Sequence, residues 1–122
     1  MRRLAVPALL LALAATACEP TEMTRVGDGV VELTVRDYRY DRQKVSVAPG
    51  LVVFNIVNAG SEPTNFRVRR KQRDVVVIAT LEPGETGRAA ARLKPGEYVM
   101  YSSVGRHETL GEHGTLIVTP DS

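Results

Sequence analysis

Two histidines stand near the end of the chain, and each has a glutamate beside it: His107 with Glu108, and His113 with Glu112. Imidazole and carboxylate groups are ligands that Zn²⁺ and Cu²⁺ accept in proteins, so this stretch is a candidate metal site. Because Glu112 and His113 are adjacent, an extended backbone would point their side chains apart. Four polar residues in one exposed loop are more often simply solvated, and both interpretations stay open here.

Two serines precede the first histidine and suggest a different chemistry. Ser102 or Ser103 with His107 would make a nucleophile and a base. An acidic residue at a useful spacing is not evident, and neither serine lies in a Gly-x-Ser-x-Gly sequence. We therefore do not predict an enzyme.

The segments that must position these residues are short strands. Apolar and polar residues alternate around Val31, Leu33 and Val35, and again around Phe66 and Val68, and a period of two is typical of half-buried strands. The stretch 74–80 is a more continuous apolar run, as expected for a strand covered on both faces. Further strands are expected near 45–47, 51–58, 88–93, 98–101 and 115–118.

Turn residues separate these strands. Pro-Gly pairs occur at 49–50, 83–84 and 95–96, each between two predicted strands. Proline favours the first central position of a type II turn, and glycine supplies the positive φ of the second. With no sustained helical period, the chain is predicted to be all-β, an antiparallel Greek-key β-sandwich of seven or eight strands.

The N-terminal residues have the features of an export signal. Two arginines precede the apolar run from Leu4 to Ala17, which leads directly into Cys18, the only cysteine. The pattern resembles a bacterial lipobox, with Ala15 in place of the usual leucine, and the resemblance implies that Cys18 is lipidated. An ordinary cleaved signal with a free Cys18 thiol is the alternative.

The predicted organisation has three parts. Residues 1–17 are a signal peptide, residues 18–29 a lipidated cysteine and a polar tether, and residues 30–120 one folded domain. The 16 basic residues lose Arg2 and Arg3 with the signal, which leaves 14 against 14 acidic ones. A neutral mature chain does not call for nucleic acid as a partner.

The order of motifs resembles a known family. The segments DYRY (37–40), VSVAPG (45–50) and VFNIVNAG (53–60) look like the first half of a small cupredoxin-like domain. The segments LKPGEY (93–98), YSSVGRH (101–107) and GEHGTLIV (111–118) look like the second half. The chain is similar to bacterial plastocyanin-like and iron-transport-associated cupredoxin domains, and the resemblance covers residues 30–119.

The resemblance also implies where a copper ligand set would stand. Copper-carrying members use two histidines, a cysteine and a weak methionine, with four residues between successive ligands of the second loop. Those positions fall here on Thr64 (Asn65 in the alternative register), Ser102, His107 and Glu112. A serine hydroxyl does not ionise near neutral pH and is a poor ligand for a soft copper ion, so a blue-copper electron carrier is not expected.

One charge cluster stands apart from the histidine loop. Arg67 and Arg69 would share a strand face, and Arg70, Lys71 and Arg73 lie in and around the following turn. In a lipid-tethered protein this cluster could contact anionic headgroups or an acidic partner. Arginines that protect a sheet edge from aggregation are the simpler interpretation.

These observations predict an exported, membrane-anchored lipoprotein facing the periplasm or the cell exterior. Its cupredoxin-like domain is expected to bind an unidentified envelope protein, with no enzymatic activity and no cofactor. The alternative is copper or zinc binding in a non-blue site by His107 with His113 or Glu112.

Overall fold

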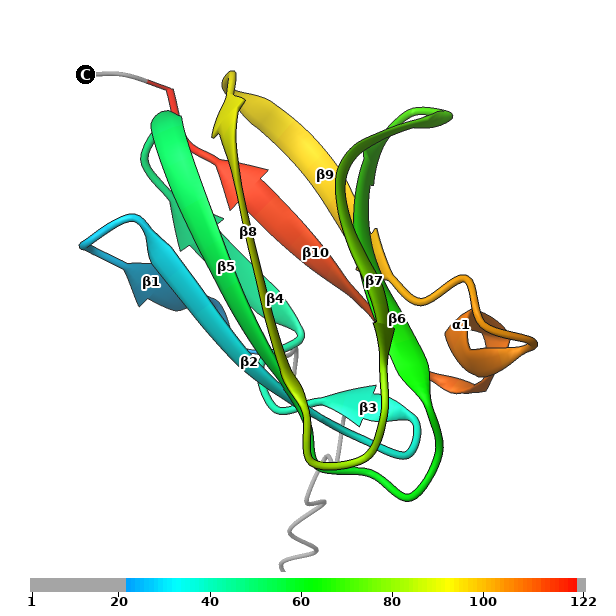
Figure 1. Ribbon diagram of the computed structural model, residues 1–122. Coiled ribbons are helices and arrows are strands. Elements are labelled where there is room, and N and C mark those ends of the chain that lie inside the picture. Colours follow the sequence, from blue (N-terminus) through cyan, green and yellow to red (C-terminus); the bar gives the residue numbers. More distant parts are fainter. Residues whose placement is uncertain (1–21, 121–122) are drawn as a thin grey trace, which may run out of the picture.

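The computed structural model describes residues 22–120, so the predicted signal peptide and Cys18 lie outside the described residues. Two sheets face one another across a common core, as Figure 1 shows. The elements are β1 (Thr24–Val26), β2 (Val30–Arg36), β3 (Arg39–Tyr40), β4 (Lys44–Val47), β5 (Gly50–Asn58), β6 (Thr64–Arg70), β7 (Arg73–Leu81), β8 (Thr86–Leu93), β9 (Gly96–Tyr101), α1 (His107–Leu110) and β10 (His113–Val118). The predicted all-β sandwich is confirmed.

The six-stranded sheet has the order β1-β4-β10-β9-β6-β7, and the four-stranded sheet has the order β3-β2-β5-β8. The predicted strands all form, and the short strands β1 and β3 are additional. The sheets are mixed rather than purely antiparallel, because β1–β4, β4–β10 and β2–β5 pair in parallel. After β2 and β3 the chain crosses to the other sheet as β4 before it returns as β5, and such crossovers make parallel neighbours.

The predicted tether is shorter than expected where the structure describes it. Thr24–Val26 pairs with β4, and Val26 packs against the core. Three residues are too few for alternation to identify a strand from sequence.

The core lies between the sheets and is built by alternation. Phe54 and Phe66 face each other across it with ring centroids 5.6 Å apart, and both are fully buried. The expectation that the apolar run 74–80 is covered on both faces is wrong. Since β7 is an edge strand with an open outer face, Val77 is 52% exposed.

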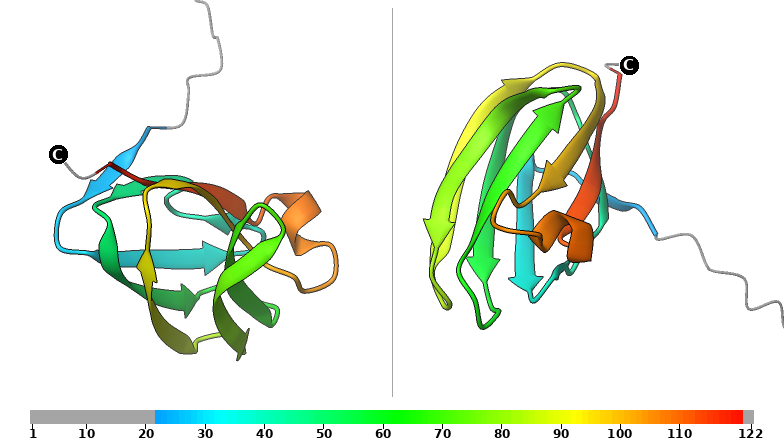
Figure 2. Two further views of the ribbon diagram at one scale, coloured as in Figure 1. Left: turned by 90° about the horizontal axis from the view of Figure 1, so that it is seen from above. Right: turned by 90° about the vertical axis from the view of Figure 1, so that its right-hand side faces the viewer.

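The predicted Pro-Gly turns have the required backbone. Gly84 has a φ of 91° and Gly50 a φ of 116°, values that glycine adopts without the steric cost other residues meet. No helix within residues 22–120 is long and apolar enough to cross a membrane. The one-turn helix α1, which sequence reasoning placed in a loop, lies at one end of the sandwich between β9 and β10 (Figure 2).

Candidate functional site

Four side chains from separate segments meet at the α1 end of the sandwich. Thr64 begins β6, Ser102 follows β9, His107 begins α1 and Glu112 precedes β10. β6 and β9 pair in antiparallel, with Arg67 opposite Tyr101. Because of this pairing, the chain that follows β9 runs toward the start of β6. All four side chains are buried, and Glu112 is only 1% exposed.

Thr64 lies at the centre of this cluster. Its Oγ1 is 3.0 Å from Ser102 Oγ and 3.5 Å from His107 Nδ1, and its hydroxyl donates a short hydrogen bond to Glu112 Oε2. The other carboxylate oxygen of Glu112 lies 3.5 Å from His107 Nδ1. We call Thr64, Ser102, His107 and Glu112 the polar cluster.

Asn65 fixes the segment after β9 to the start of β6. Its Oδ1 accepts hydrogen bonds from Ser103 N at 2.9 Å and from Ser102 Oγ at 3.1 Å, and its Nδ2 donates to Ser103 Oγ at 2.8 Å. Val104 N donates to Ser102 Oγ at 3.2 Å. The bonds of Ser102 therefore lead to Thr64 and to backbone and amide groups, which is a structural arrangement rather than a nucleophile activated by His107.

Two residues that sequence reasoning did not assign to the site cover its outer side. Glu62 Oε1 lies 3.3 Å from His107 Nε2, and Tyr38 donates a hydrogen bond of 2.6 Å to Glu62 Oε2. The Tyr38 ring lies 4.8 Å from the imidazole, centroid to centroid. The bond to Glu62 raises the pKa of Tyr38. Tyr38 lies in the DYRY segment and Glu62 in no motif, and neither stands at a ligand position of the resemblance, so only the three-dimensional contact identifies them as part of the site.

Burial changes the acidity of the cluster. It raises the pKa of Glu112 above the ordinary value of a glutamate, because a charged carboxylate loses hydration there. The hydrogen bond from Thr64 and the charge of His107 act in the opposite direction.

The other candidates of the histidine loop do not join the cluster. His113 is exposed, and the alternation of the strand directs it away from the buried Glu112. Glu108 forms a salt bridge of 2.7 Å with Arg69. Among residues 22–120, no three His, Cys, Asp or Glu side chains form a group that could hold a metal ion.

The predicted arginine cluster is divided between two places. Arg67 and Arg69 lie along β6, whereas Arg70, Lys71 and Arg73 lie at the turn between β6 and β7. Arg67 pairs with Asp74 at 2.9 Å, and the guanidinium of Arg69 lies 4.2 Å from the centre of the Tyr101 ring. Hydrogen bonds to Asp74 and to Glu108 raise the pKa values of Arg67 and Arg69 respectively. Both therefore belong to the outer face of the six-stranded sheet.

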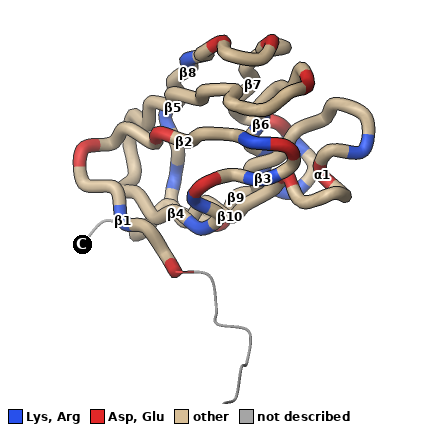
Figure 3. The backbone as a smooth tube through the Cα atoms, turned by 90° about the horizontal axis from the view of Figure 1, so that it is seen from below, with Lys and Arg blue, Asp and Glu red and all other residues tan. Residues whose placement is uncertain are grey.

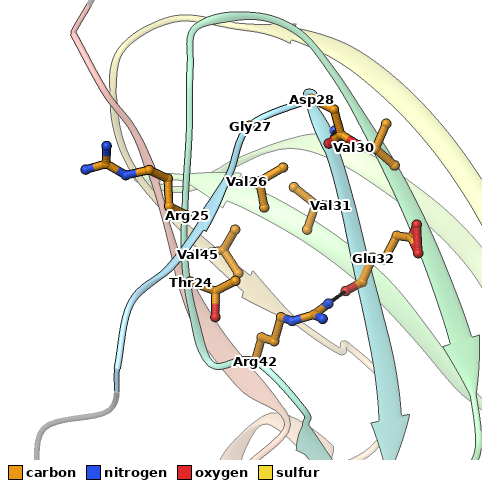
Figure 4. Close-up of a pocket in the computed structure, with 10 residues that line it drawn as sticks. All are labelled: Thr24, Arg25, Val26, Gly27, Asp28, Val30, Val31, Glu32, Arg42 and Val45. Atoms are coloured by element: carbon orange, nitrogen blue, oxygen red, sulfur yellow. Dashed lines mark hydrogen bonds between the residues drawn. The ribbon is translucent and has the colours of Figure 1, made fainter.

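A hollow between β1 and β2 has no comparable chemistry. Val26, Val31 and Val45 line it, and the Arg42 guanidinium donates a 2.6 Å hydrogen bond to the backbone oxygen of Glu32 (Figure 4). Arg25, Asp28 and Glu32 complete its charged lining, so the described part of the hollow carries both signs of charge and holds no histidine or cysteine.

Comparison with known proteins places the fold. The family model of the cupredoxin-like domain matches residues 6–118. No curated protein sequence matches the chain.

Three solved structures are similar to this chain. Their sequence identities are low, so the similarity shows the fold alone. Reduced auracyanin from Roseiflexus castenholzii has a TM-score of 0.71 at 15% identity, over 78% of this chain and 100% of that one. Auracyanin A, a blue copper protein from Chloroflexus aurantiacus, has a TM-score of 0.65 at 15% identity, over 79% and 100%. Auracyanin B has a TM-score of 0.67 at 18% identity, over 85% and 94%.

Proposed function

The chain belongs to the cupredoxin-like domain family, and we propose that it serves as a binding module of the cell envelope rather than as a blue-copper carrier. The observation that carries the proposal is the polar cluster. The four positions that the resemblance assigns to copper ligands hold Thr64, Ser102, His107 and Glu112, and the polar atoms of these side chains contact one another.

The donor set does not fit the family's blue copper ion. That centre needs two imidazoles and a thiolate, with a long axial contact to a fourth group. The cluster offers one imidazole, one carboxylate and two neutral hydroxyls. The hydroxyl of Thr64 is engaged with Glu112, and that of Ser102 with Asn65. We therefore derive no electron-transfer step for this chain.

The polar cluster instead stabilises one end of the sandwich. It joins the start of β6, the segment after β9, α1 and the start of β10, and every link buries a polar atom against a partner. Fully satisfied buried networks favour one rigid arrangement over alternatives. A rigid scaffold of this kind suits a protein whose work is to present surfaces to a partner.

Export and anchoring form the second part of the proposal. The signal-like residues 1–17 and the single Cys18 support a lipid anchor facing the periplasm or the cell exterior. Incorporation of labelled fatty acid into the full chain, absent from a Cys18→Ser variant, is the expected result. An unlabelled chain that leaves the membrane would contradict the anchor.

Metal binding at His107 is the second candidate function. The distance of 3.5 Å between His107 Nδ1 and Glu112 Oε1 favours it, since imidazole with carboxylate can hold copper or zinc in a non-blue site. Against it stand the exposure of His113 and the engagement of His107 Nε2 with Glu62.

Calorimetric titration separates the two functions. The full chain, carrying Cys18→Ser so that no thiol remains, is titrated with Cu²⁺ and Zn²⁺ beside the same chain with His107→Ala. If the protein is a binding module without a metal site, the two chains should give the same heats of titration. Stoichiometric binding that disappears with His107→Ala would establish the metal site and overturn the proposal.

A further inference from the structure

We propose that a basic groove at the end of the sandwich opposite the polar cluster binds an acidic polypeptide segment of a partner protein. The basic groove is lined by Arg70, Lys71, Arg73, Arg92 and Lys94. The inference names the binding site of the module proposed above and therefore rests on that function.

The groove exists because the edges of the two sheets separate. Near Gly87 the strands β7 and β8 are in close contact, since a Cβ there would lie 2.5 Å from Ile78 Cγ2 and 2.9 Å from Leu81 Cδ2. Toward the other end, the β6–β7 hairpin curves away from β8, as Figure 1 shows. The opening encloses about 730 Å³ between that hairpin and the start of the β8–β9 connection.

The charge of the groove has one sign. Its lining holds five cationic side chains and no carboxylate. The opposite end of the molecule differs, because basic and acidic residues are interspersed there (Figure 3). A concave surface lined by one sign of charge concentrates ligands of the other sign and speeds their association.

The walls hold one cation in place and supply apolar contact. The guanidinium of Arg70 lies 5.4 Å from the Tyr98 ring centre, above Gly96, where a Cβ would lie 2.8 Å from Arg70 Nη2. Val75 and Leu93 contribute the apolar part of the lining. This mixture suits a peptide that carries carboxylates together with apolar side chains.

The position of the groove favours a polypeptide over a lipid surface. β1 runs in parallel with β4 toward the groove end, so the chain before Thr24 arrives from the other end. β1 and β7 are also the opposite edges of one sheet, about 24 Å apart at the usual strand spacing. Covalent geometry limits the span of the six residues from Cys18 to Met23 to at most about 20 Å. An anchor at Cys18 would therefore turn the groove away from the membrane.

Fluorescence anisotropy of a labelled oligoglutamate peptide tests the groove on the full chain in neutral detergent. Arg73→Glu with Lys94→Glu reverses one charge on each wall. Arg36→Glu with Arg39→Glu changes the net charge equally at two exposed positions of β2 and β3 that do not line the groove. We expect peptide affinity to fall by about tenfold or more in the groove variant, and by less than about twofold in the control. The affinity of the parent chain should weaken as salt is added.

Equal losses in the two variants would overturn the proposal, because they would show attraction to net charge alone. A second groove variant, Arg92→Glu with Lys94→Glu, repeats the test if the first fails to fold. Vesicles of phosphatidylglycerol and phosphatidylcholine form the other arm. Groove-dependent binding of vesicles without binding of the peptide would assign the groove to lipid and overturn it as well.

The titration with Cu²⁺ keeps the two proposals apart. Tight metal binding at His107 would remove the proposed function and leave peptide binding in the groove unaffected. Absence of peptide binding in a chain that also binds no metal would remove the groove alone.

Discussion

Replacing Thr64 by valine tests whether the polar cluster stabilises the fold as a unit. The substitution keeps the shape of the side chain and removes the hydroxyl that donates to Glu112 Oε2 and lies 3.0 Å from Ser102 Oγ. Thr64 is 2% exposed, so water cannot readily take the place of that hydroxyl. The carboxylate of Glu112, itself 1% exposed, would then lose its closest hydrogen-bond donor.

The expected cost is about 2 kcal/mol in the free energy of unfolding. A buried acceptor left without its partner costs about 1–3 kcal/mol, and a charged one more. The methyl group that replaces the hydroxyl returns about 0.8 kcal/mol through apolar burial. In a domain of this size, a loss of about 2 kcal/mol lowers the melting temperature by roughly 8–16 °C.

Urea denaturation followed by circular dichroism measures this loss. Thr80→Val is the matched control, since Thr80 is exposed on β7 and the change should stay within about 0.5 kcal/mol. With Glu112→Gln as the second substitution, a double-mutant cycle should give a coupling of about 1 kcal/mol. A Thr64→Val chain as stable as the parent would refute the account of an interlocked cluster.

Three further predictions concern the cluster, the packing of the sheets and α1. Because burial raises the pKa of Glu112 in the folded chain above its ordinary value of 4.5, the folded state takes up a proton before the unfolded state does as pH falls. The stability of the parent relative to Glu112→Gln should therefore decrease as pH rises from 4.5 through the folded pKa, and a pH-independent difference in urea midpoints would contradict this. Gly87→Ala should cost about 1–3 kcal/mol through the clash with β7, whereas Gly27→Ala, whose Cβ meets nothing within 4 Å, should not destabilise the fold; equal thermal midpoints would exclude the close contact. Arg69→Ala should cost about 1 kcal/mol, because it removes the salt bridge to Glu108 of α1 and the stacking on Tyr101. High salt should reduce this loss in the free energy of unfolding. A loss that high salt does not reduce would contradict a contribution from the salt bridge.

Much of the fold follows from local pattern. Alternation located the strands on either side of the core, and the Pro-Gly pairs located turns where Gly50 and Gly84 adopt positive φ. The parallel pairing of β2 with β5 could not be predicted, because it depends on the crossover between the sheets. The exposed outer face of Val77 depends likewise on the place of β7 at an edge.

The site was only partly accessible from sequence. Motif spacing gave the positions of Thr64, Ser102, His107 and Glu112, whose convergence requires the pairing of β6 with β9. Glu62 and Tyr38 had no spacing signal, since their contact with His107 joins segments far apart in the chain. The sequence analysis also did not group Arg92 and Lys94 with Arg70. They lie at and just after the end of β8, which belongs to the other sheet, and they come near Arg70 only in the folded groove.

The most direct test of the central claim is to rebuild the copper ligand set at the polar cluster. The full chain with Cys18→Ser, Thr64→His and Ser102→Cys, in which His107 supplies the second imidazole, is titrated with Cu²⁺ and its visible absorption recorded. We predict the intense thiolate-to-copper band of a blue site, absent when Ser103→Cys replaces Ser102→Cys. A folded triple variant that binds Cu²⁺ without that band would contradict the claim that these residues occupy the family's ligand positions.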